Sequence, residues 1–269
     1  MRKTTITLVL ILLASAAILS SQPNQAKLFI KNATIVPVVG ERIEGGSILV
    51  EDGKIKAVGK ALQAPAGAQV IDATGMFVYP GFIDSYSHFG LSEIGAIPST
   101  TDYREMGKEN PELRVAWAIN PHSVHFGTGR VTGTTTALVA PAGGTFPGIS
   151  ALIKMDGWSF PEMTVKETAT SFINFPMTPR PVGEGGTVQK EAKEDVTSKL
   201  VEKIRDYLKE ARRYLELRKL AAADPGVKAP QYNAKYEALG LALDGTLPVI
   251  ISVEKLIRTP ALASSTTFR

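Results

Sequence analysis

The stretch YPGFIDSYSHFGL, residues Tyr79–Leu91, decides how this sequence is interpreted. Its apolar part, Phe82–Asp84, predicts a buried strand, and small polar residues then lead to a histidine. Because side chains alternate along a strand, Tyr86 and His88 are expected on the same side. Imidazole is a good ligand for a divalent metal, whereas a tyrosine phenol usually is not. The stretch therefore predicts a strand that ends with one strong ligand position and one unusual residue.

The composition indicates a globular protein without cysteine chemistry. The chain has 269 residues, enough for one large domain or two smaller ones. Hydrophobic residues make up 44% and charged residues 21%, a balance that supplies a core to bury. There is no cysteine in the sequence, which excludes disulfides, zinc–thiolate sites and thiol nucleophiles.

The first 26 residues have the layout of a secretory signal peptide. Arg2 and Lys3 give a positive start, and Ile6–Ile18 is uncharged and mostly apolar. This run is too short for a comfortable membrane span, although an uncleaved signal anchor is the alternative. We predict a secreted or periplasmic protein whose membrane contact is limited to residues 1–26. Cleavage would remove two positive charges and no negative one, lowering the net charge from +4 to +2, so no nucleic-acid partner is expected.

The pattern of the remaining chain changes near Pro80. Residues 27–80 predict a small antiparallel β unit, with a strong hairpin signal at 50–59, where Asp-Gly separates two strand-like runs. Beyond Pro80, strand-like runs alternate with loops and helices, including buried strands at 134–140 and 245–253. This order is typical of a parallel α/β domain.

Two helices and one long loop are expected in the second half of the chain. Residues 193–223 have apolar side chains at helical spacing and charges on the other faces, which we interpret as solvated. A second helix is predicted at 231–243, and a short one near Glu112–Ile119. Residues 160–190 are rich in proline and glycine, so a long surface loop is predicted there.

Four segments together resemble the amidohydrolase superfamily, near its imidazolonepropionase-like members. The segments are VIDATGMFVYPGFID, SYSHFGL, VTGTTTALVAPAGGTFPGISALIKMDGW and GTLPVIIS, within a span from about Lys27 to Ser252. The resemblance implies a β-sandwich part followed by a (β/α)8 barrel that binds one or two divalent metals, zinc above all, at the carboxyl ends of its strands. The implied chemistry is hydrolysis of non-peptide C–N bonds in a small molecule by a metal-activated water.

Only one expected metal ligand is present when the resemblance is carried over residue by residue. The family pattern after PGFID is His-x-His; His88 matches its second position, but Tyr86 stands at the first. A further histidine is implied where this chain has Ser252, and no match is found for the remaining ligands or the catalytic aspartate. We therefore assign no catalytic or cofactor-binding residue, and His88 is the single candidate metal ligand. A histidine held by hydrogen bonds at a strand end is the interpretation that we favour for it.

The other two histidines and a glycine-rich loop are weaker candidates. His122 and His125 have a spacing that could place both on one side of a helical turn, and with His88 they could form a rearranged three-histidine site. Surface histidines are the favoured interpretation. The loop at 140–148 lacks the residues of a phosphate loop. The resemblance allows it a role in shaping a substrate pocket.

The barrel is expected to be incomplete. A full (β/α)8 barrel needs about 250 residues, and the sequence after Pro80 is shorter than that. We predict a signal peptide at 1–26, a β-sandwich portion at 27–80 and a partial barrel at 81–269. The chain is then an N-terminal fragment, or it is completed by a partner chain or a second copy. Because Tyr86 and Ser252 replace ligands, little activity is expected, and the alternative is a non-catalytic relative that binds a ligand.

Overall fold

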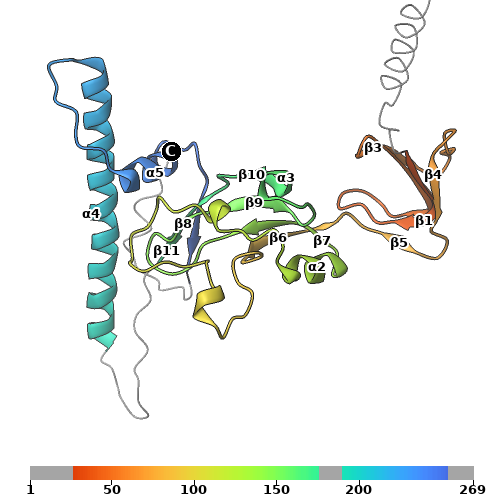
Figure 1. The fold of residues 1–269 in the computed structure, drawn as a ribbon, viewed down its shortest axis with the longest axis horizontal. Helices are drawn as coiled ribbons and strands as arrows, with labels where there is room; N and C mark the ends of the chain where they lie inside the picture. Colours follow the sequence, from red (N-terminus) through yellow and green to blue (C-terminus); the bar gives the residue numbers. More distant parts are fainter. Residues whose placement is uncertain (1–26, 176–189, 254–269) are drawn as a thin grey trace, which may run out of the picture. The chain divides into compact units, whose positions relative to one another are not determined.

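The computed structural model describes residues 27–175 and 190–253, with the side chains of the second range described from residue 198 onward. It divides the chain into two compact units that meet between Pro80 and Gly81 (Figure 1). The predicted signal peptide at 1–26 lies outside the described residues. No helix in the described part of the chain is long and apolar enough to span a membrane.

The first unit is one five-stranded sheet. Its strands are β1 Leu28–Ile35, β2 Ile43–Glu51, β3 Lys54–Gly59, β4 Gln69–Asp72 and β5 Phe77–Val78. The hairpin signal is confirmed, because β2 and β3 pair antiparallel across a turn at Asp52 and Gly53. Both residues have positive φ angles, 53° and 69°, as this kind of two-residue turn requires. The unit has a small core of Ala33, Ile35, Ile48 and Ala73.

The prediction of an antiparallel unit at 27–80 is wrong for two strands. β4 and β5 both pair with β1 in parallel. The chain leaves β3 at one edge of the sheet and crosses to the far side of β1 through residues 60–68, so it arrives in the same direction as β1. The described residues of this unit form a single sheet, without the second layer of a sandwich.

The second unit is a mixed α/β structure. Its strands are β6 Phe82–Ser87, β7 Thr134–Val139, β8 Gly148–Ile149, β9 Ala151–Lys154, β10 Thr164–Lys166, β11 Ser171–Asn174 and β12 Val249–Ser252. Its helices are α2 Val124–Val131, α3 Phe160–Met163, α4 Lys190–Ala223 and α5 Ala234–Leu243, with short 3-10 turns η1 Pro98–Thr100 and η2 Val115–Trp117. The helices predicted at 193–223 and 231–243 are confirmed as α4 and α5.

The strands of the second unit form two sheets, in the orders β10-β9-β7-β6 and β12-β11-β8, and β8 leads directly into β9. β6 and β7 pair in parallel, β9 pairs antiparallel with both β7 and β10, and β11 pairs antiparallel with β8 and parallel with β12. The two hydrogen-bonded groups join at Ser150, whose N–H donates to the Thr170 carbonyl over 2.9 Å. The order is therefore β6, β7, β8/β9, β10/β11 and β12. In this order β6, β7, β11 and β12 all run the same way, so their carboxyl ends share one edge.

The sheet curls toward the face that carries Tyr86. The ring of Tyr86 on β6 lies 5.7 Å from the ring of Phe172 on β11, between centroids. In a flat sheet, strands three places apart would lie about 14 Å from each other. Contact between these two side chains therefore indicates curvature, although the described strands do not close into a barrel.

Three expectations about individual segments are wrong. β6 and β12 are not buried, and Ile83 and Ile251 are 68% and 56% exposed. Both strands are edges of the described sheet, so each lacks a neighbour on one side. Within the loop predicted at 160–190, residues 160–174 contain α3, β10 and β11, and residues 176–189 lie outside the described part of the chain. Pro161 lies in the first turn of α3, where its missing N–H costs nothing. The helix predicted at Glu112–Ile119 is reduced to the single turn η2.

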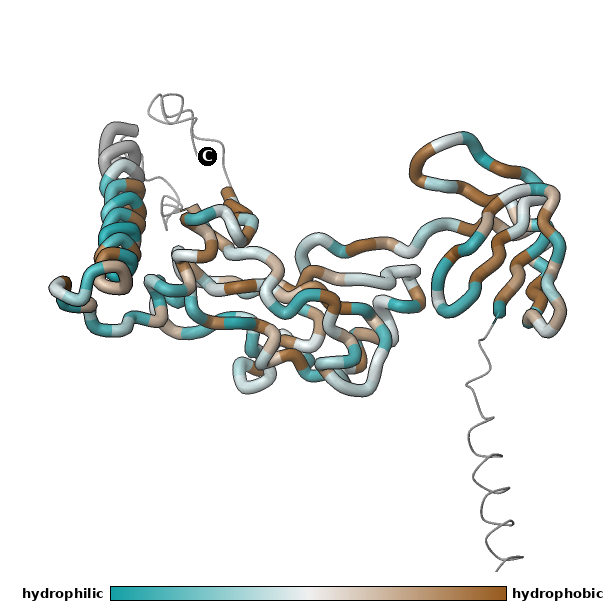
Figure 2. Tube along the Cα trace, turned by 90° about the horizontal axis from the view of Figure 1, so that it is seen from above, coloured by the Kyte–Doolittle hydropathy of each residue, from teal (hydrophilic) through white to brown (hydrophobic). Residues whose placement is uncertain are grey.

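The helices of the second unit pack in two places. α2 and η2 cover the face of the sheet opposite Tyr86, in a core that includes Phe126, Val139 and Ile153. α4 and α5 pack on each other around Ala211 and Leu239. Figure 2 shows that α4 is predominantly hydrophilic, in agreement with one packed stripe and solvated remaining faces.

Candidate functional site

The end of β6 places Tyr86 and His88 together on the concave face of the sheet. Ser87 between them pairs with Val139, which belongs to the core under α2. The neighbours of Ser87 along the strand therefore point to the opposite face. The rings of Tyr86 and His88 lie edge to face with centroids 5.3 Å apart, as strand alternation predicts.

His88 is held on two sides. Its Nδ1–H donates a hydrogen bond to the Ala140 carbonyl at 2.9 Å, just beyond the end of β7. Its ring stacks on the ring of Tyr103, with centroids 4.2 Å apart and an interplanar angle of 14°. Burial lowers the pKa of His88 more than the Ala140 carbonyl raises it. The imidazole is therefore neutral at pH 7, with Nδ1 protonated and Nε2 unprotonated.

Tyr86 is a packed but partly exposed phenol. It lies between Phe172 and His88, and 48% of its surface is exposed. Burial, and to a smaller degree the proximity of Tyr103, raise the pKa of Tyr86 above its usual value of 10. A phenol that resists ionisation is a poor metal ligand, so position 86 does not replace the imidazole that the resemblance implies.

The described residues do not fit the divalent metal that the resemblance implies. They contain no group of three or more His, Asp or Glu side chains that could hold a metal ion. A catalytic zinc normally has three protein ligands and a water. Ser252 ends β12, where its carbonyl accepts the N–H of Phe175 at 2.9 Å. Its neutral hydroxyl is a weak substitute for imidazole.

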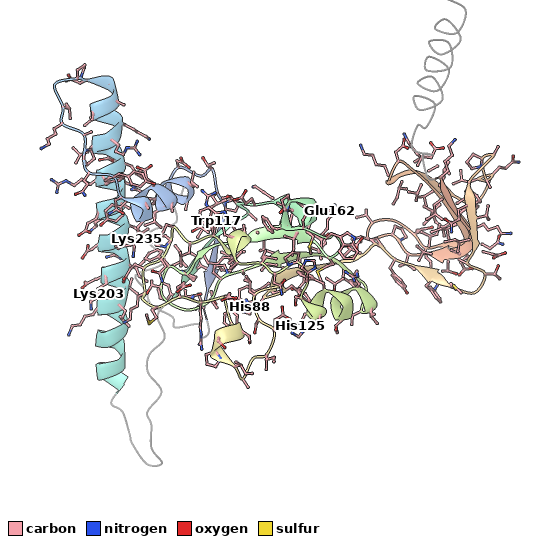
Figure 3. The ribbon with its side chains drawn as sticks, in the orientation of Figure 1. His88, Trp117, His125, Glu162, Lys203 and Lys235 are labelled. Atoms are coloured by element: carbon pink, nitrogen blue, oxygen red, sulfur yellow. The ribbon has the colours of Figure 1, made fainter. Side chains whose placement is uncertain are left out.

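His122 and His125 do not join His88. His122 precedes Ser123, the N-cap of α2, and its N–H donates to Asn120. His125 lies in the first turn of α2, and its Nε2 is 3.0 Å from the Glu93 carbonyl. His125 thus ties the start of α2 to the segment after β6 (Figure 3 labels His125 and His88). The three-histidine arrangement is not present among the described residues.

The glycine-rich loop at 140–148 is a support for Tyr103. The Ala142 N–H donates to the Tyr103 carbonyl over 2.7 Å, and two further N–H groups of the loop donate to the Lys108 carbonyl. A Cβ at Gly144 would lie 2.8 Å from the Lys108 carbonyl oxygen, so glycine permits this close approach. Sequence reasoning missed both Tyr103 and Phe172, because neither belongs to a spacing motif.

Comparisons with known proteins relate the chain to one superfamily. It is 42% identical over 78 residues to a D-hydantoinase of Geobacillus stearothermophilus, covering 29% of this chain and 16% of the relative. It is 61% identical over 41 residues to a dihydroorotase of Geobacter sulfurreducens, covering 15% and 10%. No model of a known protein family matches the chain.

A solved structure extends the likeness to most of the chain. An amidohydrolase from Thermotoga maritima aligns with a TM-score of 0.69 and 24% identity, covering 85% of this chain and 58% of that one. At this identity the match shows the fold alone. Together with the sequence relatives, it relates the chain to the amidohydrolase superfamily, with the branch not specified. The matched part is less than a fifth of the length of either curated relative.

Proposed function

We propose that this chain is an amidohydrolase-type protein whose family chemistry is hydrolysis of non-peptide C–N bonds in small molecules. The observation that carries this proposal is the placement of Tyr86 and His88. They stand at the carboxyl edge of a curved sheet in which β6, β7, β11 and β12 run the same way. Barrel enzymes place their sites at this edge. The named relatives, a D-hydantoinase and a dihydroorotase, support the reaction class.

The curved sheet is, in this proposal, part of a (β/α)8 barrel. The curl of the sheet, the shared direction of four strands and the helix α2 on the outer face support it. The first unit is then a portion of the β-sandwich that accompanies such barrels. Secretion or a periplasmic location, and a small-molecule ligand without nucleic acid, remain proposals from the sequence.

The chain itself is proposed to have weak or no hydrolytic activity. Bound metal would supply an activated water, but His88 is the one candidate ligand at this strand end, and Tyr86 and Ser252 are poor replacements. The chain's own residues orient His88 through the Ala140 carbonyl and the Tyr103 ring, and burial lowers its pKa. The alternative, a relative that binds without catalysis, is favoured by the same two substitutions. A chain completed by a partner or a second copy is the third possibility.

Elemental analysis and activity measurement on the same sample test the proposal. The chain from residue 27 onward is dialysed against zinc or manganese, and its metal content and its hydrolysis of hydantoin and dihydroorotate are measured. We expect well under one metal per chain and no turnover above buffer. About one metal per chain that is lost in His88→Ala, together with turnover, would overturn the proposed inactivity. His122→Ala is the control, because His122 lies outside this site.

A further inference from the structure

An exposed tryptophan of the second unit is held in a fixed position. Trp117 ends η2, and 75% of its surface is exposed. Its indole N–H donates to Oε1 of Glu167 over 3.2 Å, and the guanidinium of Arg114 lies over its ring, 5.6 Å from the centre. Nη1 of Arg114 is 3.8 Å from the same carboxylate oxygen, so the three side chains contact one another. We call Trp117, Arg114 and Glu167 the indole platform.

The other tryptophan of the sequence lacks this support. Trp158 is 81% exposed, and its indole makes no hydrogen bond or ring contact with the described residues. Single exposed apolar side chains of this kind are common on protein surfaces. Trp117 differs because its indole is oriented before a ligand arrives, and binding to a preorganised side chain costs less conformational entropy.

The indole platform lies on the outer face of the sheet, away from the end of β6. η2 packs with α2 over the core of this outer face. On β9, Leu152 lies between two residues of that core, so its side chain points to the concave face. Lys166 of β10 pairs with Leu152, and Glu167 after it returns to the side of η2. Figure 3 shows Trp117 apart from His88.

The chemistry of the platform favours an uncharged ligand with hydroxyl groups. Arg114 and Glu167 pair with each other, so together they add no net charge. A guanidinium has five N–H donors and a carboxylate has several lone pairs, so both can form further hydrogen bonds. The face of an indole ring is negative and attracts C–H groups. A pyranose with equatorial hydroxyls carries C–H groups on its faces and hydroxyls around its rim, so it matches both parts of the platform.

We infer that the indole platform is a binding site for a neutral, glucose-type ring of an oligosaccharide. The face of the sugar stacks on the free face of Trp117, and its hydroxyls form hydrogen bonds with Arg114 and Glu167. The inference goes beyond the proposed function and does not rest on it, because it requires neither a metal nor hydrolysis and uses the other face of the sheet.

Titration of the full chain with cellohexaose tests this site. Cellohexaose is uncharged, and all ring substituents of its glucose units are equatorial, whereas sorbitol has similar hydroxyls but no ring. We expect calorimetry and saturation-transfer NMR to detect cellohexaose binding that is at least tenfold tighter than the binding of sorbitol. No binding of cellohexaose, or equal binding of the two compounds, would overturn the inference.

Two tryptophan variants locate the binding. Trp117→Ala removes the stacking surface, so the affinity for cellohexaose should fall roughly fivefold to tenfold. Trp158→Ala removes an equally exposed indole that has no oriented contacts, and it should leave the affinity unchanged. Equal losses in the two variants would contradict the role of the indole platform.

A decaproline peptide tests the other kind of occupant for an exposed indole. We expect no binding of this peptide at concentrations that saturate the chain with cellohexaose. Decaproline binding that is lost in Trp117→Ala, together with no binding of cellohexaose, would overturn the sugar site and assign the surface to a protein partner.

Discussion

At the scale of single residues, the side chain at position 86 decides whether the end of β6 offers a second metal ligand or a phenol hydroxyl. An imidazole there would stand beside His88 and offer a second metal ligand, whereas the phenol offers a hydroxyl with a raised pKa. The residues that contact Tyr86 and His88 are compatible with a phenol at position 86. Phe172 and Tyr103 hold the two rings, and Ala140 fixes the tautomer of the imidazole.

Restoring the imidazole alone should not restore metal binding. In Tyr86→His, two histidines would lie at the end of β6, and the Asp84 carboxylate two residues before position 86 is already engaged by the N–H of residue 86 over 3.0 Å. We expect no more zinc per chain than in the unchanged protein after dialysis, by elemental analysis. Close to one zinc per chain in Tyr86→His would show that a third ligand exists.

Gly148 should be intolerant of any side chain. Its φ angle is 133°, and a Cβ would lie 2.5 Å from the Leu113 carbonyl oxygen. We expect Gly148→Ala to lower the free energy of unfolding by about 2 kcal/mol or more, measured by urea titration. The matched control is Gly127→Ala in α2, where nothing lies within 4 Å. There the change should raise stability by about 0.5–1 kcal/mol, and a loss at both positions would contradict the steric explanation.

Asp72 should make the first unit sensitive to acid. Hydrogen bonds from the hydroxyl and N–H of Thr74, and then from Lys31 and Asn32, hold its pKa well below the usual 3.8. A lowered pKa in the folded state adds stability above pH 3.8 that is lost as the pH falls further. We expect Asp72→Asn to flatten the pH dependence of unfolding below pH 4. Glu41→Gln, at an exposed residue without hydrogen bonds or ion pairs to described residues, is the control.

At the scale of elements, a buried hydroxyl adds a polar link to the apolar contact between α4 and α5. Tyr214 on α4 donates to Glu237 over 2.7 Å and accepts the N–H of Asn233, the N-cap of α5, over 3.1 Å. Its ring also packs against Tyr236, with centroids 5.5 Å apart. The hydroxyl thus links the body of one helix to the start of the next.

Removing that hydroxyl should loosen α5. Tyr214→Phe keeps the ring packing but leaves Glu237 and the Asn233 N–H without this partner, at a cost of about 1–2 kcal/mol in the free energy of unfolding. Thermal unfolding followed by circular dichroism measures the effect. Tyr232→Phe, at a tyrosine that is 72% exposed, should change stability little. Equal stability of Tyr214→Phe and the unchanged protein would contradict the link.

The elements with strong local signals were predictable, and those that depend on partners were not. Helical spacing identified α4 and α5, and Asp52-Gly53 identified the β2–β3 hairpin. The parallel pairing of β4 and the exposure of β12 depend on which strands become neighbours, and no local pattern encodes that. At the site, alternation placed Tyr86 with His88, whereas Phe172 reaches them only through the curl of the sheet.

At the scale of the whole molecule, β12 is an edge among the described strands, and we expect self-association there. β12 pairs with β11 on one side, and among the described strands none covers its other side. Val249, Ile251 and Val253 are 37%, 56% and 52% exposed along this edge. An apolar strand edge with unpaired N–H and carbonyl groups is a template for pairing with another chain.

A charge on this edge should therefore reduce self-association of the chain from residue 27 onward. Ile251→Lys places a charged side chain on β12, as natural edge strands do, and costs little packing because Ile251 is more than half exposed. We expect the concentration at which light scattering detects association to rise severalfold. Val131→Lys, at an 89% exposed residue that ends α2, makes the same apolar-to-charged change away from any strand edge and should have little effect. Only the Ile251 change alters an edge available for strand pairing. If both variants raise the association concentration equally, the effect comes from net charge and the role of the β12 edge is contradicted.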